Sequence, residues 1–230
     1  MVFSPDSKTL ALPILDKTVR LYNVSTRSER LRLEGNKEHI VTVAFTPDGK
    51  TLITGGKPIK FWDPVTGKEQ ATRIDPAANL DSAVRLAVSP DGKKLAAALA
   101  NYSVVLFNLE TMTEEFRLKG HKDEIFGMTF SPDGKSLATA SWDSTMKLWH
   151  VASGEPLLTF KSKFGVSWSV AFSPDNSILA FGSGRAEGGE ITLLRVPIRE
   201  KLEITKSTGE VSSGPEYGSA ITPANNVTTQ

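Results

Sequence analysis

The pattern of hydrophobic and polar positions repeats five times along the chain. Each copy begins with an apolar residue and continues into a polar turn, and the copies start at positions 3, 45, 88, 130 and 172. They read FSPDSK, FTPDGK, VSPDGK, FSPDGK and FSPDNS. A leucine follows seven residues after each start: Leu10, Leu52, Leu95, Leu137 and Leu179. A period of 42 or 43 residues predicts an array of equivalent structural units.

Each unit is predicted to contain four short strands. Large and small residues alternate before Phe45 and Phe172, which is the period of a strand. Pro-Asp-Gly then predicts a tight hairpin, because proline presets φ and glycine or asparagine tolerates a positive φ. In the fourth unit the remaining strands are expected at 137–141, 145–151 and 157–161. Helical periodicity is absent, so we predict an all-β fold, a β-propeller with four-stranded antiparallel blades and five units.

The fourth unit resembles a complete WD repeat. It contains Gly120-His121, the 130–135 hexapeptide, Asp143 and Lys147-Leu148-Trp149, and the second unit contains the literal pair Trp62-Asp63. Residues 1 to about 205 are therefore similar to the WD-repeat family, as a bacterial-type member with four full repeats and one truncated repeat. The expected units are about 1–34, 35–75, 76–119, 120–161 and 162–205, and 206–230 is predicted to be a disordered tail because it is rich in Ser, Thr, Gly, Asn and Pro.

The resemblance implies a structural hydrogen-bond network in the fourth unit. It would join His121 to Asp143, to the hydroxyl of Thr139 or Ser141, and to Trp149, while Trp62 and Asp63 serve the second unit. A His, Asp and Ser set also suggests a hydrolase triad. A triad needs an exposed nucleophile, whereas this set follows from blade position and should be buried. We therefore expect a structural role and no catalytic residue.

Composition removes several classes of function. The 27 Lys and Arg against 26 Asp and Glu give a net charge of +1, which argues against binding nucleic acid or a membrane surface through bulk charge. The chain has no cysteine, and its histidines lack metal-ligand spacing, so we expect no metal and no cofactor. The hairpin aspartates lie on different units and cannot form an acid/base pair. The glycine-rich stretch 182–189 is expected to be a loop, and without a signal peptide the protein is expected to be cytoplasmic.

Three aromatic residues fall near one rim of the predicted propeller. Phe126 and Trp168 each precede their hexapeptide by four residues, and Trp142 directly precedes the turn residue Asp143. Two interpretations remain open at this point. The side chains either pack one blade against the next or form a patch that binds a protein partner, since tryptophan is enriched at interface hot spots.

The resemblance implies a non-catalytic scaffold that binds a protein or peptide on the propeller face. The alternatives are a propeller-fold hydrolase and a sensor segment of a longer signalling protein, because the fold hosts many activities. The first unit begins in the middle of a strand, so we expect an incomplete, open ring, and a genuine five-bladed ring is the alternative. About two further blades would come from upstream sequence or from a second chain, or the arc would self-associate.

Overall fold

The computed structural model describes residues 1–36, 38–70, 81–163, 165–185 and 188–195. Over these residues the chain forms nineteen strands and no helix, and thus no helix that could cross a membrane. The end of the last predicted unit (196–205), where its fourth strand is expected, and the predicted tail 206–230 lie outside the described residues.

The strands form five sheets in chain order. The first sheet contains β1 (Val2–Phe3), β2 (Thr9–Pro13), β3 (Val19–Asn23) and β4 (Ser28–Leu33). The second contains β5 (Val43–Phe45), β6 (Leu52–Thr54), β7 (Lys60–Trp62) and β8 (Glu69–Gln70). The third contains β9 (Ala83–Val88), β10 (Lys94–Leu99), β11 (Val104–Asn108) and β12 (Thr113–Leu118). The fourth contains β13 (Ile125–Phe130), β14 (Ser136–Ser141), β15 (Thr145–His150) and β16 (Pro156–Lys161). The fifth contains β17 (Val166–Phe172), β18 (Ile178–Arg185) and β19 (Gly188–Arg195).

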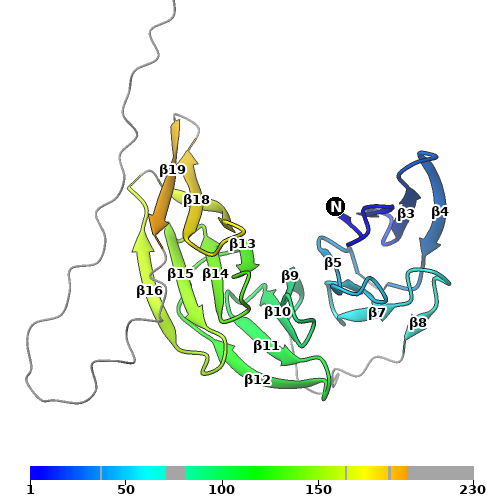
Figure 1. The fold of residues 1–230 in the computed structure, drawn as a ribbon, viewed down its shortest axis with the longest axis horizontal. Coiled ribbons are helices and arrows are strands. Elements are labelled where there is room, and N and C mark those ends of the chain that lie inside the picture. Colours follow the sequence, from blue (N-terminus) through cyan, green and yellow to red (C-terminus); the bar gives the residue numbers. More distant parts are fainter. Residues whose placement is uncertain (37, 71–80, 164, 186–187, 196–230) are drawn as a thin grey trace, which may run out of the picture.

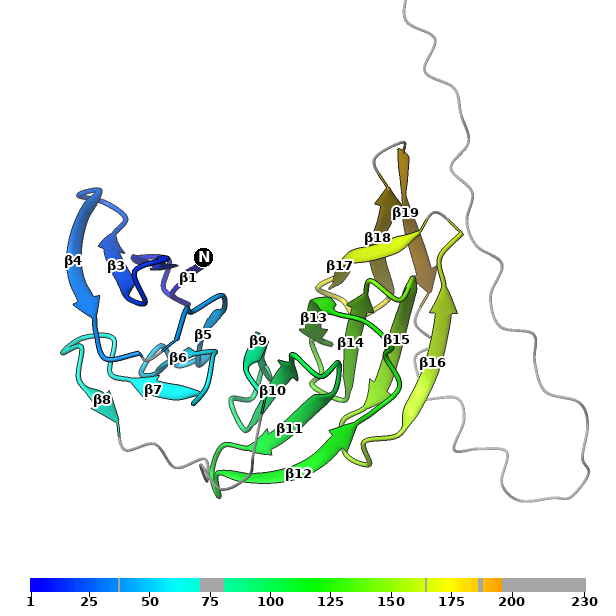
Figure 2. The ribbon, with the colours of Figure 1, turned by 180° about the vertical axis from the view of Figure 1, so that it is seen from behind.

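Every sheet is an antiparallel meander in which each strand pairs with the next one along the chain. Figures 1 and 2 show the sheets as successive blades of an arc, with the first strand of each sheet on the inside and, in the four-stranded sheets, the fourth on the outside. In both views the first and fifth sheets lie apart, so the arc does not close. The all-β, open propeller architecture predicted from the repeat is confirmed.

The repeated hexapeptide closes each inner hairpin by the same side-chain contact. The Ser or Thr hydroxyl at its second position donates a hydrogen bond of 2.6 Å to the aspartate two residues later in all five sheets. The next turn residue has a positive φ, and it is one of Ser7, Gly49, Gly92, Gly134 and Asn176. The hairpin aspartates therefore serve turn formation, each on its own sheet.

The repeated leucine is the centre of a row of three cross-strand neighbours, here called the leucine row. The rows are Phe3–Leu10–Tyr22, Phe45–Leu52–Trp62, Val88–Leu95–Phe107, Phe130–Leu137–Trp149 and Phe172–Leu179–Leu194. Side chains alternate between the two faces of a strand, so the neighbouring cross-strand pair points to the opposite face and is here called the facing pair. The facing pairs are Ala11–Leu21, Ile53–Phe61, Ala96–Leu106, Ala138–Leu148 and Ala180–Leu193.

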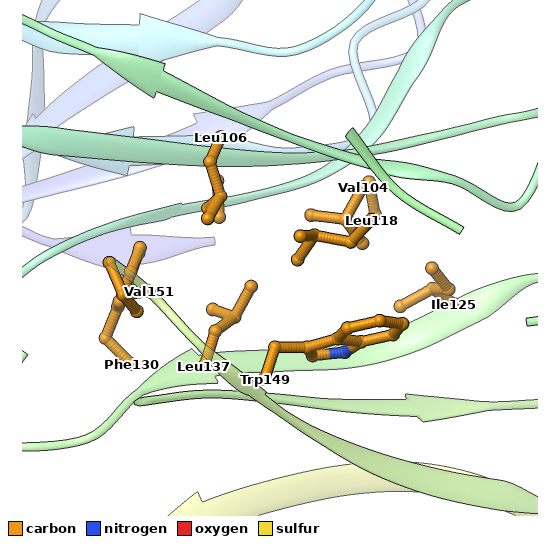
Figure 3. Close-up of a cluster of buried hydrophobic side chains, with 10 residues drawn as sticks. Val104, Leu106, Leu118, Ile125, Phe130, Leu137, Trp149 and Val151 are labelled. Carbon is orange, nitrogen blue, oxygen red and sulfur yellow. The ribbon is translucent and has the colours of Figure 1, made fainter. Parts of the chain in front are cut away.

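Each hydrophobic cluster of the molecule joins one facing pair to the leucine row of the next sheet. Four such clusters occur among the described residues, one for each junction between successive sheets. Figure 3 shows the junction of the third and fourth sheets, where Leu106 faces Leu137 and Trp149. In four of the five facing pairs one residue is alanine, which leaves room for the larger residues of the leucine row.

The described residues of the glycine-rich stretch 182–189 are strand residues, and the prediction of a loop is wrong for them. They extend β18 to Arg185 and begin β19 at Gly188, and Gly184 pairs with Gly189. A Cβ on Gly184 would lie 2.8 Å from both the carbonyl oxygen of Gly188 and the Cα of Gly189. Glycine is therefore needed here for close strand pairing, a use that composition does not distinguish from a flexible loop.

Truncation of a covered facing-pair leucine is expected to be far more damaging than truncation of an uncovered one. Leu106 is fully buried, whereas the equivalent Leu193 is 41% exposed. Leu106→Ala should lower the free energy of unfolding by about 2–5 kcal/mol. Leu193→Ala should lower it by less than about 1 kcal/mol. Urea denaturation of both variants at low protein concentration measures the difference, and equal losses would contradict the packing scheme.

Candidate functional site

His121 lies in the loop before β13, the first strand of the fourth sheet, and both of its ring nitrogens make hydrogen bonds. Its Nδ1 is 2.9 Å from Oδ2 of Asp143, and its Nε2 is 2.7 Å from the hydroxyl of Thr139. The His121 side chain is only 1% exposed and that of Asp143 7%. With the Nδ1 proton directed at the carboxylate, Nε2 accepts from Thr139. The imidazole thus connects a loop to the middle of β14.

Thr139, and not Ser141, supplies the hydroxyl of this network. The indole N–H of Trp149 donates to Thr139 Oγ1 over 3.0 Å. Ser141 instead donates to the carbonyl of Asp123 and accepts the N–H of Asp143, and both of these distances are 3.0 Å. Thr139 and Ser141 lie on the same face of β14, so their places along the strand explain the difference. Thr139 is two residues from Leu137, the cross-strand neighbour of Trp149, whereas Ser141 ends the strand beside the turn.

The Asp143 carboxylate is the charged end of the network. Burial raises the pKa of this carboxyl, but hydrogen bonds from His121, Thr145 and the backbone N–H of Lys122 outweigh burial and hold the pKa well below its usual range. The Thr145 hydroxyl donates over 2.6 Å and the Lys122 N–H over 2.9 Å. A carboxylate with this many donors remains ionised at neutral pH.

The second sheet contains a shorter version of the same arrangement. The indole N–H of Trp62 donates to Thr54 over 3.0 Å, and Thr54 in turn donates to the amide oxygen of Asn36 over 3.4 Å. Asn36 stands where the fourth sheet has His121. Asp63 accepts the backbone N–H groups of two residues that follow it, so it shapes the turn after β7.

These contacts do not form a catalytic site. The His121 imidazole contacts a threonine hydroxyl in place of an exposed serine, and substrate cannot reach either group because both are buried. Within the described part of the chain, no three His, Asp or Glu side chains lie close enough together to hold a metal ion. The network has the geometry of a structural element.

The three predicted rim aromatics lie together where the fourth and fifth sheets meet. The ring of Phe126 stacks on Trp142 with a centroid distance of 4.7 Å and an interplanar angle of 15°. Trp168 lies edge-on to both rings at 5.4 Å. We call these three residues the rim aromatic cluster. Trp142 is 38% exposed and Trp168 46%, so the cluster is packed internally and still presents indole surface to solvent.

Two β-bulges orient the side chains of Phe126 and Trp168. The register of β13 with β14 shifts between Ile125 and Gly127, which leaves Phe126 unpaired. The register of β17 with β18 shifts in the same way around Trp168. A bulged residue leaves the strict alternation of faces, and bulges commonly redirect side chains near functional sites. The hydrophobic pattern indicated where these residues lie in the repeat but gave no sign of the bulges.

Arg85 completes the cluster and was not among the predicted residues. Its guanidinium lies 5.1 Å from the centroid of the Phe126 ring, and its Nε donates to the Phe126 carbonyl over 2.9 Å. Because Arg85 belongs to β9, it connects the third sheet to the fourth. One signal in the sequence pointed to this role. Arg85 is charged, whereas the equivalent residues of the fourth and fifth sheets are Gly127 and Ser169.

Comparison with known families identifies the repeat. The model of the WD domain, G-beta repeat, matches residues 27–58 and 112–150. Each match begins in or just before the outer strand of one sheet and runs into the inner strands of the next. The chain therefore contains WD repeats at these two positions. The sequence repeat thus spans two neighbouring blades.

Individual WD-repeat relatives match parts of the chain. Human apoptotic protease-activating factor 1 is 38% identical over 100 residues, which is 40% of this chain and 8% of the relative. The small ribosomal subunit protein RACK1y of rice is 32% identical over 113 residues, or 47% of this chain and 32% of the relative. Coronin-7 of mouse is 44% identical over 45 residues, or 20% of this chain and 5% of the relative. The chain spans less than a third of the length of each of these relatives.

Trp149→Ala is expected to loosen the fourth WD blade and the blades beside it. The indole is 2% exposed within the cluster that joins the third and fourth sheets, and such truncations cost about 3–5 kcal/mol. Repeat units couple mainly to their nearest neighbours, so faster hydrogen exchange should centre on the third to fifth sheets. The exposed Tyr102→Ala is the control, and an unchanged melting temperature for Trp149→Ala would refute the assignment.

Asp143→Asn is expected to destabilise the protein at neutral pH more than in acid. The pKa of Asp143 is lower in the folded chain than the usual unfolded value of about 3.9, so its contribution is complete above that value and is lost as the pH falls through the folded pKa. The variant should lose about 1.5–3 kcal/mol at pH near 7. Urea melts at neutral and acidic pH should show the gap from the parent narrowing in acid; a constant gap would contradict this origin.

Proposed function

We propose that this chain is a non-catalytic interaction scaffold that binds a protein or peptide over the rim aromatic cluster. The exposed indoles of Trp142 and Trp168 carry this proposal. Large aromatic side chains at an interface contribute much binding energy at small conformational cost, and they dominate hot spots. On a soluble surface, adjacent exposed tryptophans are uncommon without a partner.

The cluster is also well positioned before any partner arrives. Stacking between Phe126 and Trp142, the two bulges and the Arg85 guanidinium restrict the rings. A preorganised surface loses little side-chain entropy on binding. The cluster spans the rim of two sheets, which suits an extended peptide segment with apolar or aromatic side chains.

The names of two relatives agree with a role exercised through other proteins. One is named a protein of the small ribosomal subunit and another a protease-activating factor. For the hydrolase alternative, the described residues offer no supporting observation, because the His121 network is buried and its donors and acceptors are already paired. The scaffold function is therefore the one that the geometry supports best.

Trp142→Ala is expected to weaken peptide binding while leaving the fold intact. Peptides selected from a displayed random library on the parent chain serve as defined probes, and their affinities are measured by fluorescence anisotropy. The variant should lose at least about 2 kcal/mol of binding free energy, since it removes one of the two exposed indoles of the cluster. Its free energy of unfolding should fall by no more than about 1.5 kcal/mol, the value of an aromatic pair.

Tyr102→Ala is the matched control for this experiment. Tyr102 is 37% exposed and lies in the equivalent turn of the third sheet, yet it is outside the cluster. Its variant should bind the selected peptides like the parent. The proposal fails if no peptide is enriched on the parent, or if Trp142→Ala and Tyr102→Ala bind equally well. A collapse of the unfolding midpoint in Trp142→Ala would instead make Trp142 a packing residue.

A further inference from the structure

The fifth sheet ends the described arc with an uncovered facing pair. Leu193 is 41% exposed, whereas Leu148, at the same place in the fourth sheet, is 8% exposed. The next apolar position shows the same contrast, since Ile191 is 73% exposed and the equivalent Met146 is fully buried. Among the described residues, no following sheet covers this face. In each of the first four sheets the equivalent face is covered by the leucine row of the next sheet. We call the uncovered face of the fifth sheet the receiving face.

The first sheet ends the arc on its other side with an uncovered leucine row. Phe3 is 53% exposed, whereas the equivalent Phe45 is 9% exposed. Leu10 and Tyr22 are half-buried, although the central leucine of the next sheet, Leu52, is fully buried. Val24, beside this row, is 39% exposed. In the other sheets the equivalent face packs on the facing pair of the preceding sheet. We call the uncovered face of the first sheet the inserting face.

The two uncovered faces are thus complementary by construction. Four junctions inside the chain show how such halves fit, because in each one a leucine row with at least one aromatic residue covers a facing pair that contains a small or aliphatic residue. The two ends of one arc lie apart, so they do not cover each other (Figures 1 and 2). A second copy of the chain presents the missing half at each end.

We propose that this chain self-associates head to tail. The leucine row of the first sheet of one copy packs on Ala180, Ile191 and Leu193 of the next copy and continues the array of blades across the contact. Such a contact is heterologous and leaves one free half at each end of the pair, so further copies can add. The contact removes the two apolar faces from water, which supplies its driving force. It does not use Trp142, so it is independent of the proposed peptide site.

Blocking one end at a time tests this proposal on the 230-residue chain. Leu193→Glu places a carboxylate in the receiving face, and Phe3→Glu places one in the inserting face. Leu15→Glu is the control, because Leu15 is 84% exposed in a turn of the first sheet and belongs to neither face. Sedimentation velocity over a wide concentration range should show growing assemblies for the parent and the control. Each blocked variant alone should self-associate at least about thirty-fold more weakly.

Mixing the two blocked variants gives the decisive result. The intact first sheet of the Leu193→Glu chain should dock on the intact fifth sheet of the Phe3→Glu chain. Because both remaining ends are blocked, the mixture should form a one-to-one complex that does not grow. A mixture that remains monomeric, or a parent chain that is monomeric at every concentration, overturns the proposal. So do blocked variants that assemble like the control.

Circular dichroism melts show whether each variant folds. Both substituted side chains are substantially exposed, so folding should be retained. If either variant is unfolded, Ile191→Glu or Val24→Glu blocks the same end and the same outcomes apply. A compact, closed monomer of the parent in small-angle X-ray scattering also counts against the proposal, since it would mean that the two faces of one chain cover each other.

Discussion

The packing of a leucine row against the facing pair of the preceding sheet is the interaction on which the rest of this structure depends. A sheet of three or four short strands has two apolar faces and cannot bury either one alone. In the second, third and fourth sheets, one face covers the preceding sheet and the other is covered by the next. Stability therefore belongs to the junctions more than to the sheets, and the curvature of the arc follows from repeating one junction.

Much of this arrangement was predictable because the same constraint acts five times. A leucine at a fixed distance from each hairpin had to occupy the same place in each sheet, and the Ser/Thr-Pro-Asp sequence closes its hairpin through contacts within six residues. Local chemistry of this kind can be read from sequence. The fourth-sheet network was also predictable as a set of residues, since His121, Asp143 and Trp149 follow the family pattern.

The features that escaped prediction depend on backbone register or on contacts between sheets. A one-residue bulge decides where Phe126 and Trp168 point, and the order of polar and apolar residues does not reveal it. The choice of Thr139 over Ser141 depends on the register of β14 with β15, which places Trp149 opposite Leu137, two residues from Thr139. Arg85 reaches Phe126 across a sheet boundary, a distance of 41 residues along the chain. The 182–189 glycines allow close pairing, although their composition suggested a loop.

Departures from the repeat separate the residues that build the array from those that distinguish this chain. Where the five sheets agree, as at the hairpin aspartates and the central leucines, the shared residue has a structural cause in every copy. Phe126, Trp142 and Trp168 have no counterpart in the first three sheets, and their contacts involve only two sheets and the adjoining Arg85. The exposed Leu193 differs in another way, because its chemistry matches the repeat while no sheet among the described residues covers it. The first kind of departure gives a surface its own specificity. The second leaves a surface whose partner is indicated by the four junctions. In each of them a facing pair packs against a leucine row, and a leucine row of another chain has the same chemistry.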